Sequence, residues 1–67
     1  MTSEEGSGQG RYIIEYVAMG ESVKVTAIDP VSSREVSIVG PVKAPRKQLA
    51  ELAIRKLLYV LNRDKDE

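Results

Sequence analysis

The chain has 67 residues, with ten basic and ten acidic side chains, no cysteine and no histidine. This length allows one small domain, and the balanced charge gives no global field that would favour nucleic acid or a membrane. The absence of histidine and cysteine removes the usual general base and the usual metal ligands, so we expect no enzyme, no cofactor and no metal site.

The first ten residues are polar and contain three glycines and two acids, so the sequence predicts a disordered N-terminal tail over residues 1–10. A single small domain is expected over residues 11–62. A charged C-terminal tail is expected over residues 63–67, which carry three acids and two cations.

Three segments of the domain have the composition of strands. The first spans 11–19, and a tight Gly20-Glu21 connection joins it to the second, 22–29, in which apolar and polar residues alternate. Turn residues follow at 29–33, where Asp29 can accept hydrogen bonds from the turn backbone. The third segment spans 34–40, and Gly40-Pro41 ends it.

The segment 45–62 is predicted to be one amphipathic helix. At 100° per residue, one stripe of this helix is apolar and wide enough to face a sheet. The residues of the stripe are Leu49, Ala50, Ala53, Ile54, Leu57, Val60 and Leu61. Leu52 and Tyr59 lie outside the stripe, seven residues apart. They either tuck under the edge of the sheet or meet a second molecule.

The order of the segments predicts an α+β fold, a three-stranded antiparallel β-meander (β-β-β-α) packed against one C-terminal helix. One helix can cover only one face of such a sheet. Five apolar residues are expected on the other face: Ile13, Val17, Met19, Ile28 and Val39. They are either scattered exposed residues of the ordinary kind or part of an interface with a partner or a second copy. A domain this short is marginally stable alone, which favours a homodimer.

The start of the helix is unusually basic. Pro45 suits the first turn, but no Ser, Thr, Asp or Asn stands before it as a cap. Lys43, Arg46 and Lys47 crowd the positive end of the helix dipole, which is unfavourable unless an anion binds there. The candidate anions are a phosphate, a nucleic-acid backbone or a partner's carboxylate. The other reading is that these cations pair with acids elsewhere in the chain, at Glu4, Glu5, Asp29 or Glu35.

Residues Val23 to Leu61 carry a resemblance. A strand ending in Asp29-Pro30, a strand Glu35-Val36-Ser37-Ile38-Val39-Gly40-Pro41 and a helix containing LAELAIRKLLYVL resemble a short bacterial family of unknown function. In that pattern we would expect glycine at the position of Ser33. The resemblance implies the β-β-β-α fold and a bacterial, cytoplasmic setting, but no activity and no site residues.

The β-β-β-α order with a basic helix start also resembles the C-terminal part of a double-stranded RNA-binding domain, in which clustered lysines at a helix start meet phosphates. Ala53-Ile54 and Leu57-Leu58 match the paired small and apolar positions of that helix. The resemblance implies that Arg46 and Lys47 would contact phosphate, with Lys43 nearby. The sequence otherwise lacks this family's first helix.

These observations lead to two hypotheses on function. The first is a protein–protein interaction or self-association module, with an unknown protein or a second copy as partner. The alternative is nucleic-acid or phosphate binding through the basic start of the helix. The lack of cysteine favours a cytoplasmic location, and no apolar run reaches the length of a membrane span, so no membrane partner is expected. The N-terminus does not have the pattern of a secretory signal.

Overall fold

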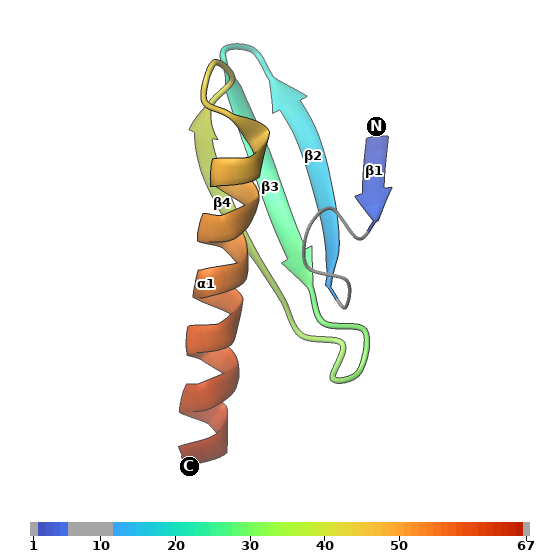
Figure 1. The fold of residues 1–67 in the computed structure, drawn as a ribbon, viewed down its shortest axis with the longest axis vertical. Helices are drawn as coiled ribbons and strands as arrows, with labels where there is room; N and C mark the ends of the chain where they lie inside the picture. Colours follow the sequence, from blue (N-terminus) through green and yellow to red (C-terminus); the bar gives the residue numbers. More distant parts are fainter. Residues whose placement is uncertain (1, 6–11, 67) are drawn as a thin grey trace.

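The computed structural model describes residues 2–5 and 12–66, with side chains described for residues 12–63. In this part of the chain the elements are β1 (Thr2–Glu5), β2 (Ile13–Met19), β3 (Ser22–Ile28), β4 (Glu35–Pro41) and α1 (Arg46–Asp66). The strands form one antiparallel sheet in the order β1-β2-β3-β4, and α1 lies across one face (Figure 1). The α+β class is therefore confirmed, with β2, β3 and β4 as the predicted meander and α1 as the predicted helix.

The structure differs from the sequence prediction at both ends of the chain. Thr2–Glu5 form a short edge strand paired with β2, where a disordered tail was expected. The rest of that predicted tail, residues 1 and 6–10, lies outside the described residues. At the other end α1 runs to Asp66 and takes in most of the predicted charged tail. No glycine or proline follows Asn62, so nothing in the sequence forces the helix to end there.

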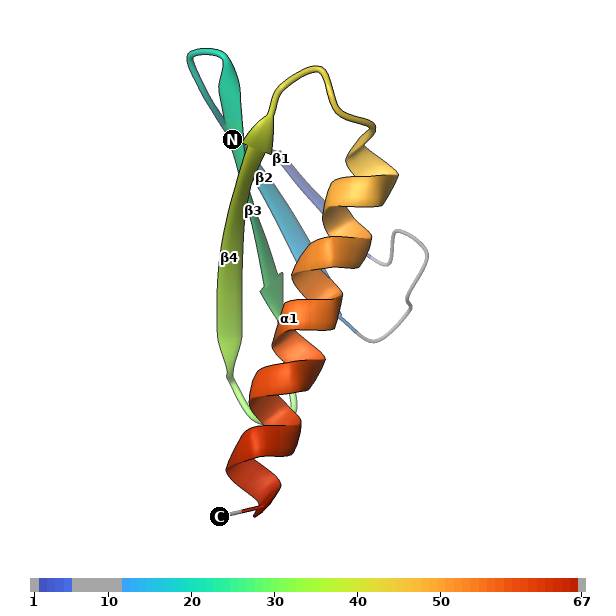
Figure 2. The ribbon, with the colours of Figure 1, turned by 90° about the vertical axis from the view of Figure 1, so that its left-hand side faces the viewer.

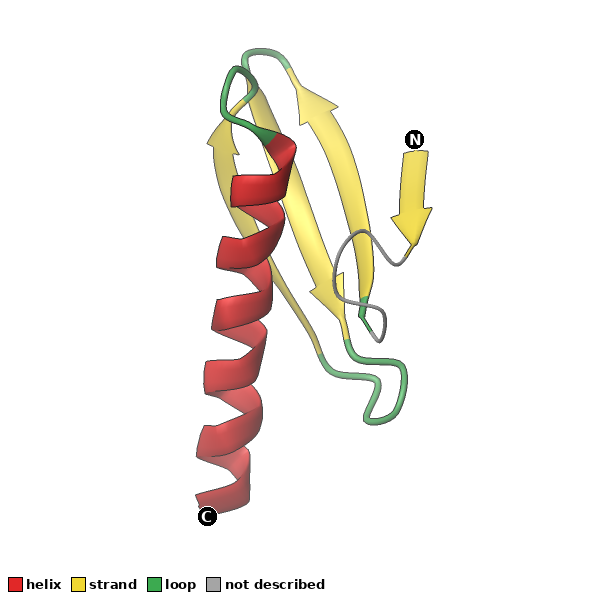
Figure 3. Ribbon diagram, viewed as in Figure 1, coloured by secondary structure: helices red, strands yellow, loops and turns green. Residues whose placement is uncertain are grey.

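The helix is longer than the sheet that it covers. Its 21 residues span about 31 Å at 1.5 Å per residue, whereas each seven-residue strand of the meander spans about 23 Å. Figure 2 shows α1 on one side of the sheet, with its C-terminal turns continuing past the end of the strands. No described element covers the opposite face. Figure 3 shows the loops between β2 and α1 gathered at the two ends of the sheet.

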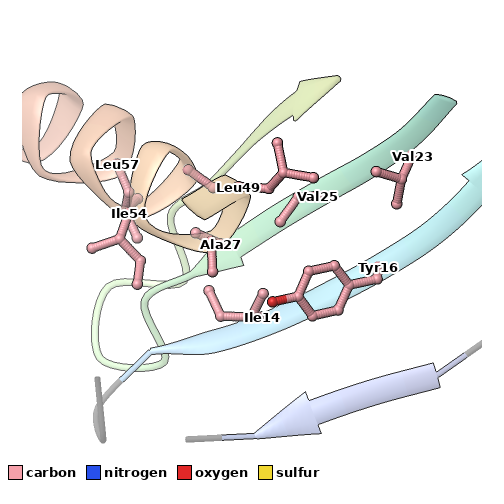
Figure 4. Close-up of a cluster of buried hydrophobic side chains, with 10 residues drawn as sticks. Ile14, Tyr16, Val23, Val25, Ala27, Leu49, Ile54 and Leu57 are labelled. Atoms are coloured by element: carbon pink, nitrogen blue, oxygen red, sulfur yellow. The ribbon is translucent and has the colours of Figure 1, made fainter. Parts of the chain in front are cut away.

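The core lies between α1 and the sheet and contains the predicted apolar stripe. The helix contributes Leu49, Ala50, Ala53, Ile54 and Leu57, all buried, and the strands contribute Ile14, Tyr16, Val23, Val25 and Ala27 (Figure 4). Val60 and Leu61 of the stripe are half-buried. The strand residues are alternate positions of β2 and β3, as the pleat of a half-buried sheet requires. Because these side chains fill one face, the residues between them must lie on the other.

Gly40 allows the helix to approach β4 closely. A Cβ atom built on Gly40 would lie 2.7 Å from the Leu49 Cδ2 atom, closer than real side chains approach one another. Leu49 is itself buried in the core. Glycine at this position therefore leaves the space that the Leu49 side chain fills.

The turn between β3 and β4 is stabilised by Asp29, as predicted. Its Oδ1 accepts the Val31 N–H at 3.1 Å, and its Oδ2 accepts the Ser32 hydroxyl at 3.0 Å. The Asp29 carbonyl accepts the Ser33 N–H at 2.8 Å. Ser33 has a φ of 66°, in the left-handed region where glycine is favoured. This conformation explains why a glycine is expected at that position in the sequence.

We predict that Gly40→Ala lowers the free energy of unfolding by about 1–3 kcal/mol, because the new methyl group meets Leu49. The measurement is a denaturant melt of a double-mutant cycle with Leu49→Ala. In the Leu49→Ala background the same Gly40→Ala change should cost much less. An equal cost in both backgrounds would show that the contact with Leu49 is not the cause.

We predict that Ser33→Gly raises the free energy of unfolding by about 1 kcal/mol, because it removes the steric cost of a left-handed backbone at a residue with a Cβ atom. A denaturant melt of the variant measures this gain. Ser32→Gly is the contrasting variant, because Ser32 does not have a positive φ. The change removes the hydroxyl group that donates to the Asp29 carboxylate, so it should lower the free energy of unfolding. A loss of stability in Ser33→Gly would contradict the explanation.

Candidate functional site

The face of the sheet that α1 leaves uncovered carries all five apolar residues predicted there. Ile13 and Ile28 are directly opposite one another on β2 and β3. Val17 of β2 and Val39 of β4 both pair with Lys24 of β3, one from each side. The fifth residue, Met19, precedes the β2–β3 turn. We call this surface the open face.

The open face is partly apolar and partly polar. Met19 is 46% exposed and Val39 is 63% exposed, while Ile13, Val17 and Ile28 are half-buried by their neighbours in the sheet. The polar positions include the exposed Lys24 and the half-buried Glu15. At the centre, the Thr26 and Ser37 hydroxyl groups are hydrogen-bonded to one another at 2.9 Å. The face therefore offers separated apolar patches with charged residues between them.

The helix begins at Arg46, one residue later than the sequence predicted. The Leu49 N–H donates to the Pro45 carbonyl at 3.1 Å, which makes Pro45 the residue that precedes the first turn. The first turn contains no acidic residue. The Ala44 N–H donates to the Pro41 carbonyl at 3.0 Å, so a tight turn connects β4 to the helix.

The three cations predicted to bind an anion face different surroundings. The Arg46 guanidinium lies over the Tyr16 ring, 4.8 Å from its centroid, and the Tyr16 hydroxyl donates to the Arg46 carbonyl at 3.4 Å. Lys43 lines a hollow of about 300 Å³ together with Glu21, Pro41 and Val42. Lys47 is exposed on the helix. Arg46 thus turns toward the sheet of its own chain, and Lys43 shares its hollow with an acid.

One further surface contains the helix flank of Leu52 and Tyr59 that the sequence placed outside the apolar stripe. The Lys56 ammonium group donates to the backbone carbonyl of Ser37 in β4, at 2.9 Å. Leu52 and Tyr59, the two helix residues outside the apolar stripe, are 43% and 63% exposed. Their separations from Lys56, four and three residues, place them on the same side of α1. The sequence therefore contained the signal for this surface, but not its position beside β4.

Within the described residues, no group of three acidic side chains is placed to hold a metal ion. The helix in that same part is not apolar enough over its length to cross a membrane.

The fold and these surfaces can be set beside known proteins. The model of one family, described as a domain of unknown function (DUF6898), matches residues 9–64. The chain belongs to this family. The match confirms the resemblance to a family of unknown function, and it extends beyond Val23 to Leu61 in both directions. No curated protein and no solved structure matches the chain.

We predict that Arg46→Gln lowers the free energy of unfolding by about 0.5–1 kcal/mol, because the variant loses the cation–π contact with Tyr16. Lys47→Gln removes the same charge one residue later and should change stability by less than about 0.5 kcal/mol. Denaturant melts of the two variants compare them directly. Equal effects would mean that the general charge at the helix start, and not the ring contact, determines stability.

Proposed function

We propose that this domain is a protein-association module that binds a second copy of itself through the open face. The observation that carries the proposal is the presence of five apolar side chains on one uncovered face of the sheet. Two of them, Met19 and Val39, are substantially exposed. Burying apolar area of this kind is the main favourable term in protein association.

The charges on the open face support a second copy as the partner. Glu15 and Lys24 lie on neighbouring strands, because Glu15 pairs with Thr26 and Lys24 is two residues before it. A two-fold axis midway between them would place Glu15 of each copy over Lys24 of the other. The charges between the apolar patches would then be matched on association, so they would not oppose it.

The size of the sheet limits the strength of the association. Three seven-residue strands cover about 23 Å by 14 Å, a small area compared with ordinary stable interfaces. The dimer is therefore expected to be weak, dissociating in the micromolar range. A one-helix domain of this length has a small core, so even a weak dimer would add usefully to its stability.

The proposal assigns no catalytic chemistry, because the sequence contains no histidine and no cysteine. A cytoplasmic, bacterial setting is part of the proposal and rests on the lack of cysteine and on the family resemblance. Phosphate or nucleic-acid binding by Lys43, Arg46 and Lys47 is the weaker proposal, since the Arg46 guanidinium already stacks on Tyr16.

We predict that sedimentation equilibrium over a concentration series will show a reversible dimer, little affected by raising the salt concentration. Val17→Lys and Met19→Lys should each raise the dissociation constant by about tenfold or more, because each places a cation within the buried apolar area. Val31→Lys is the matched control, since Val31 is exposed in the β3–β4 turn, away from the open face. It should leave the dissociation constant unchanged.

A strict monomer at all concentrations would overturn the proposal, as would equal effects of Val17→Lys and Val31→Lys. Circular dichroism of each variant ensures that the comparison is made between folded proteins. Binding of a short RNA duplex that weakens steeply with salt, and is lost in a Lys43→Glu, Lys47→Glu double variant, would favour the alternative function instead.

A further inference from the structure

The outer edge of β4 is free in the described sheet, and its hydrogen-bonding groups can be assigned. The Val42 N–H donates to the Glu21 carbonyl at 2.9 Å, which continues the β3–β4 ladder by one step. In an antiparallel ladder, alternate residues point their N–H and C=O groups toward the same neighbour. The groups of Val36, Ile38 and Gly40 therefore face β3. Those of Glu35, Ser37 and Val39 face outward.

The Lys56 hydrogen bond agrees with this assignment. Its acceptor, the Ser37 carbonyl, is one of the groups assigned to the outer edge. The bond also shows which side of α1 overhangs that edge. Leu52 and Tyr59 lie on this side, and Arg63 follows Lys56 by seven residues, with its guanidinium 6.0 Å from the Tyr59 ring centroid. The free edge thus runs beside a helix flank that is apolar and cationic.

Within the part of α1 whose side chains are described, the charged residues of this flank are all cationic. Among residues 12–63, no acid lies on the Lys56 side of α1, because Glu51 is five residues before Lys56 and falls about 140° away around the helix. Glu35 belongs to the same edge. However, it pairs with Ile28 in register, so its side chain is on the open face, opposite α1. A strand added to β4 would meet cations on its helix side.

We propose that the outer edge of β4 and the Leu52–Lys56–Tyr59 flank bind an extended acidic segment of a partner protein as an additional antiparallel or parallel strand. Edge strands commonly bind peptides in this way, with the main chain giving affinity and alternate side chains giving specificity. The segment would alternate acidic and apolar residues. Its acids would face Lys56 and Arg63, and its apolar residues would continue the open face beside Val39.

Charge also argues against a second copy at this edge. A two-fold pairing of β4 with itself, centred near Ser37, would bring the Lys56 side chains of the two copies together, and no acid among residues 46–63 lies on either flank to compensate. An acidic segment would instead be attracted to these cations. The surface and the partner both differ from those of the open-face dimer, so this proposal stands independently of it.

Lys56 can either promote or oppose the binding of a strand at the β4 edge. Lysines on edge strands protect proteins against unspecific pairing, and here the ammonium group occupies the Ser37 carbonyl. A carbonyl oxygen has two lone pairs, so it can accept a bond from Lys56 and another from an added strand. If Lys56 recruits an acidic strand, removing its charge weakens binding. If Lys56 only blocks pairing at this edge, removing its charge strengthens binding.

The experiment is an NMR titration of the full chain carrying Val17→Lys and Met19→Lys, which together weaken dimerisation through the open face. The probe is a synthetic eight-residue peptide of alternating valine and glutamate. We expect the amide signals of Ser37 and Val39 to shift more than those of Val36 and Ile38, whose N–H groups face β3. A peptide of alternating valine and lysine should bind about tenfold more weakly or not at all.

Two pairs of variants test the flank. Lys56→Gln should weaken binding about three- to fivefold, as for an exposed ion pair, while Lys47→Gln, about 180° around the helix, should not. Leu52→Glu should weaken it about tenfold or more, because it places a carboxylate beside the acids of the segment. Leu58→Glu is its control, since Leu58 is also 43% exposed but lies about 200° around the helix from Lys56.

Three results would overturn the proposal. The first is no binding of the acidic peptide at millimolar concentration, or equal binding of the lysine peptide. The second is tighter binding of the acidic peptide by Lys56→Gln, which would show that Lys56 blocks strand pairing at the β4 edge. The third is a shift pattern centred on the open face or the helix start, with no preference for the Ser37 and Val39 amides. None of these results affects the dimer measured on the unmodified chain.

Discussion

The close contact of α1 with β3 and β4 is the constraint on which the remaining structure depends. The helix meets the sheet through small residues, with Ala53 and Ala27 fully buried, while Gly40 leaves room for Leu49. Small side chains at the contact bring the two layers close enough to bury Leu57 completely. In a domain with so few buried residues, each of these contacts is a large share of the total stability.

The same placement of α1 determines what remains uncovered. The helix contacts β3 and β4 most, so its Lys56 side overhangs the edge of β4, and the Lys56 ammonium group can reach the Ser37 carbonyl. It also covers only one face, which leaves Val17, Met19 and Val39 without a covering element in the described structure. The open face and the β4 edge are therefore two consequences of one packing arrangement.

At the basic start of the helix, a tertiary contact offsets an unfavourable local charge. Arg46 is unfavourable next to the positive end of the helix dipole. The structure places its guanidinium over the electron-rich face of Tyr16, a residue thirty positions earlier in the chain. The ring contact offsets part of that cost without an external anion. Sequence reasoning identified the misplaced charge correctly but could not find its partner, because the contact depends on how β2 lies under the helix.

The sequence predicted most strongly those features that depend on near neighbours. Alternation located β2, β3 and β4, the 3.6-residue period located the buried stripe, and Asp29 located the turn in which Ser33 takes its positive φ. Thr2–Glu5 have no apolar alternation, so their pairing with β2 could not be predicted. Leu52 and Tyr59 were recognised as outside the stripe, yet a helical projection contains no information on which strand a flank faces. The hydrogen bond from Lys56 to Ser37 supplies that information, because it places the flank beside the outer edge of β4. The positive charge of Lys56 then limits which segments can bind at that edge.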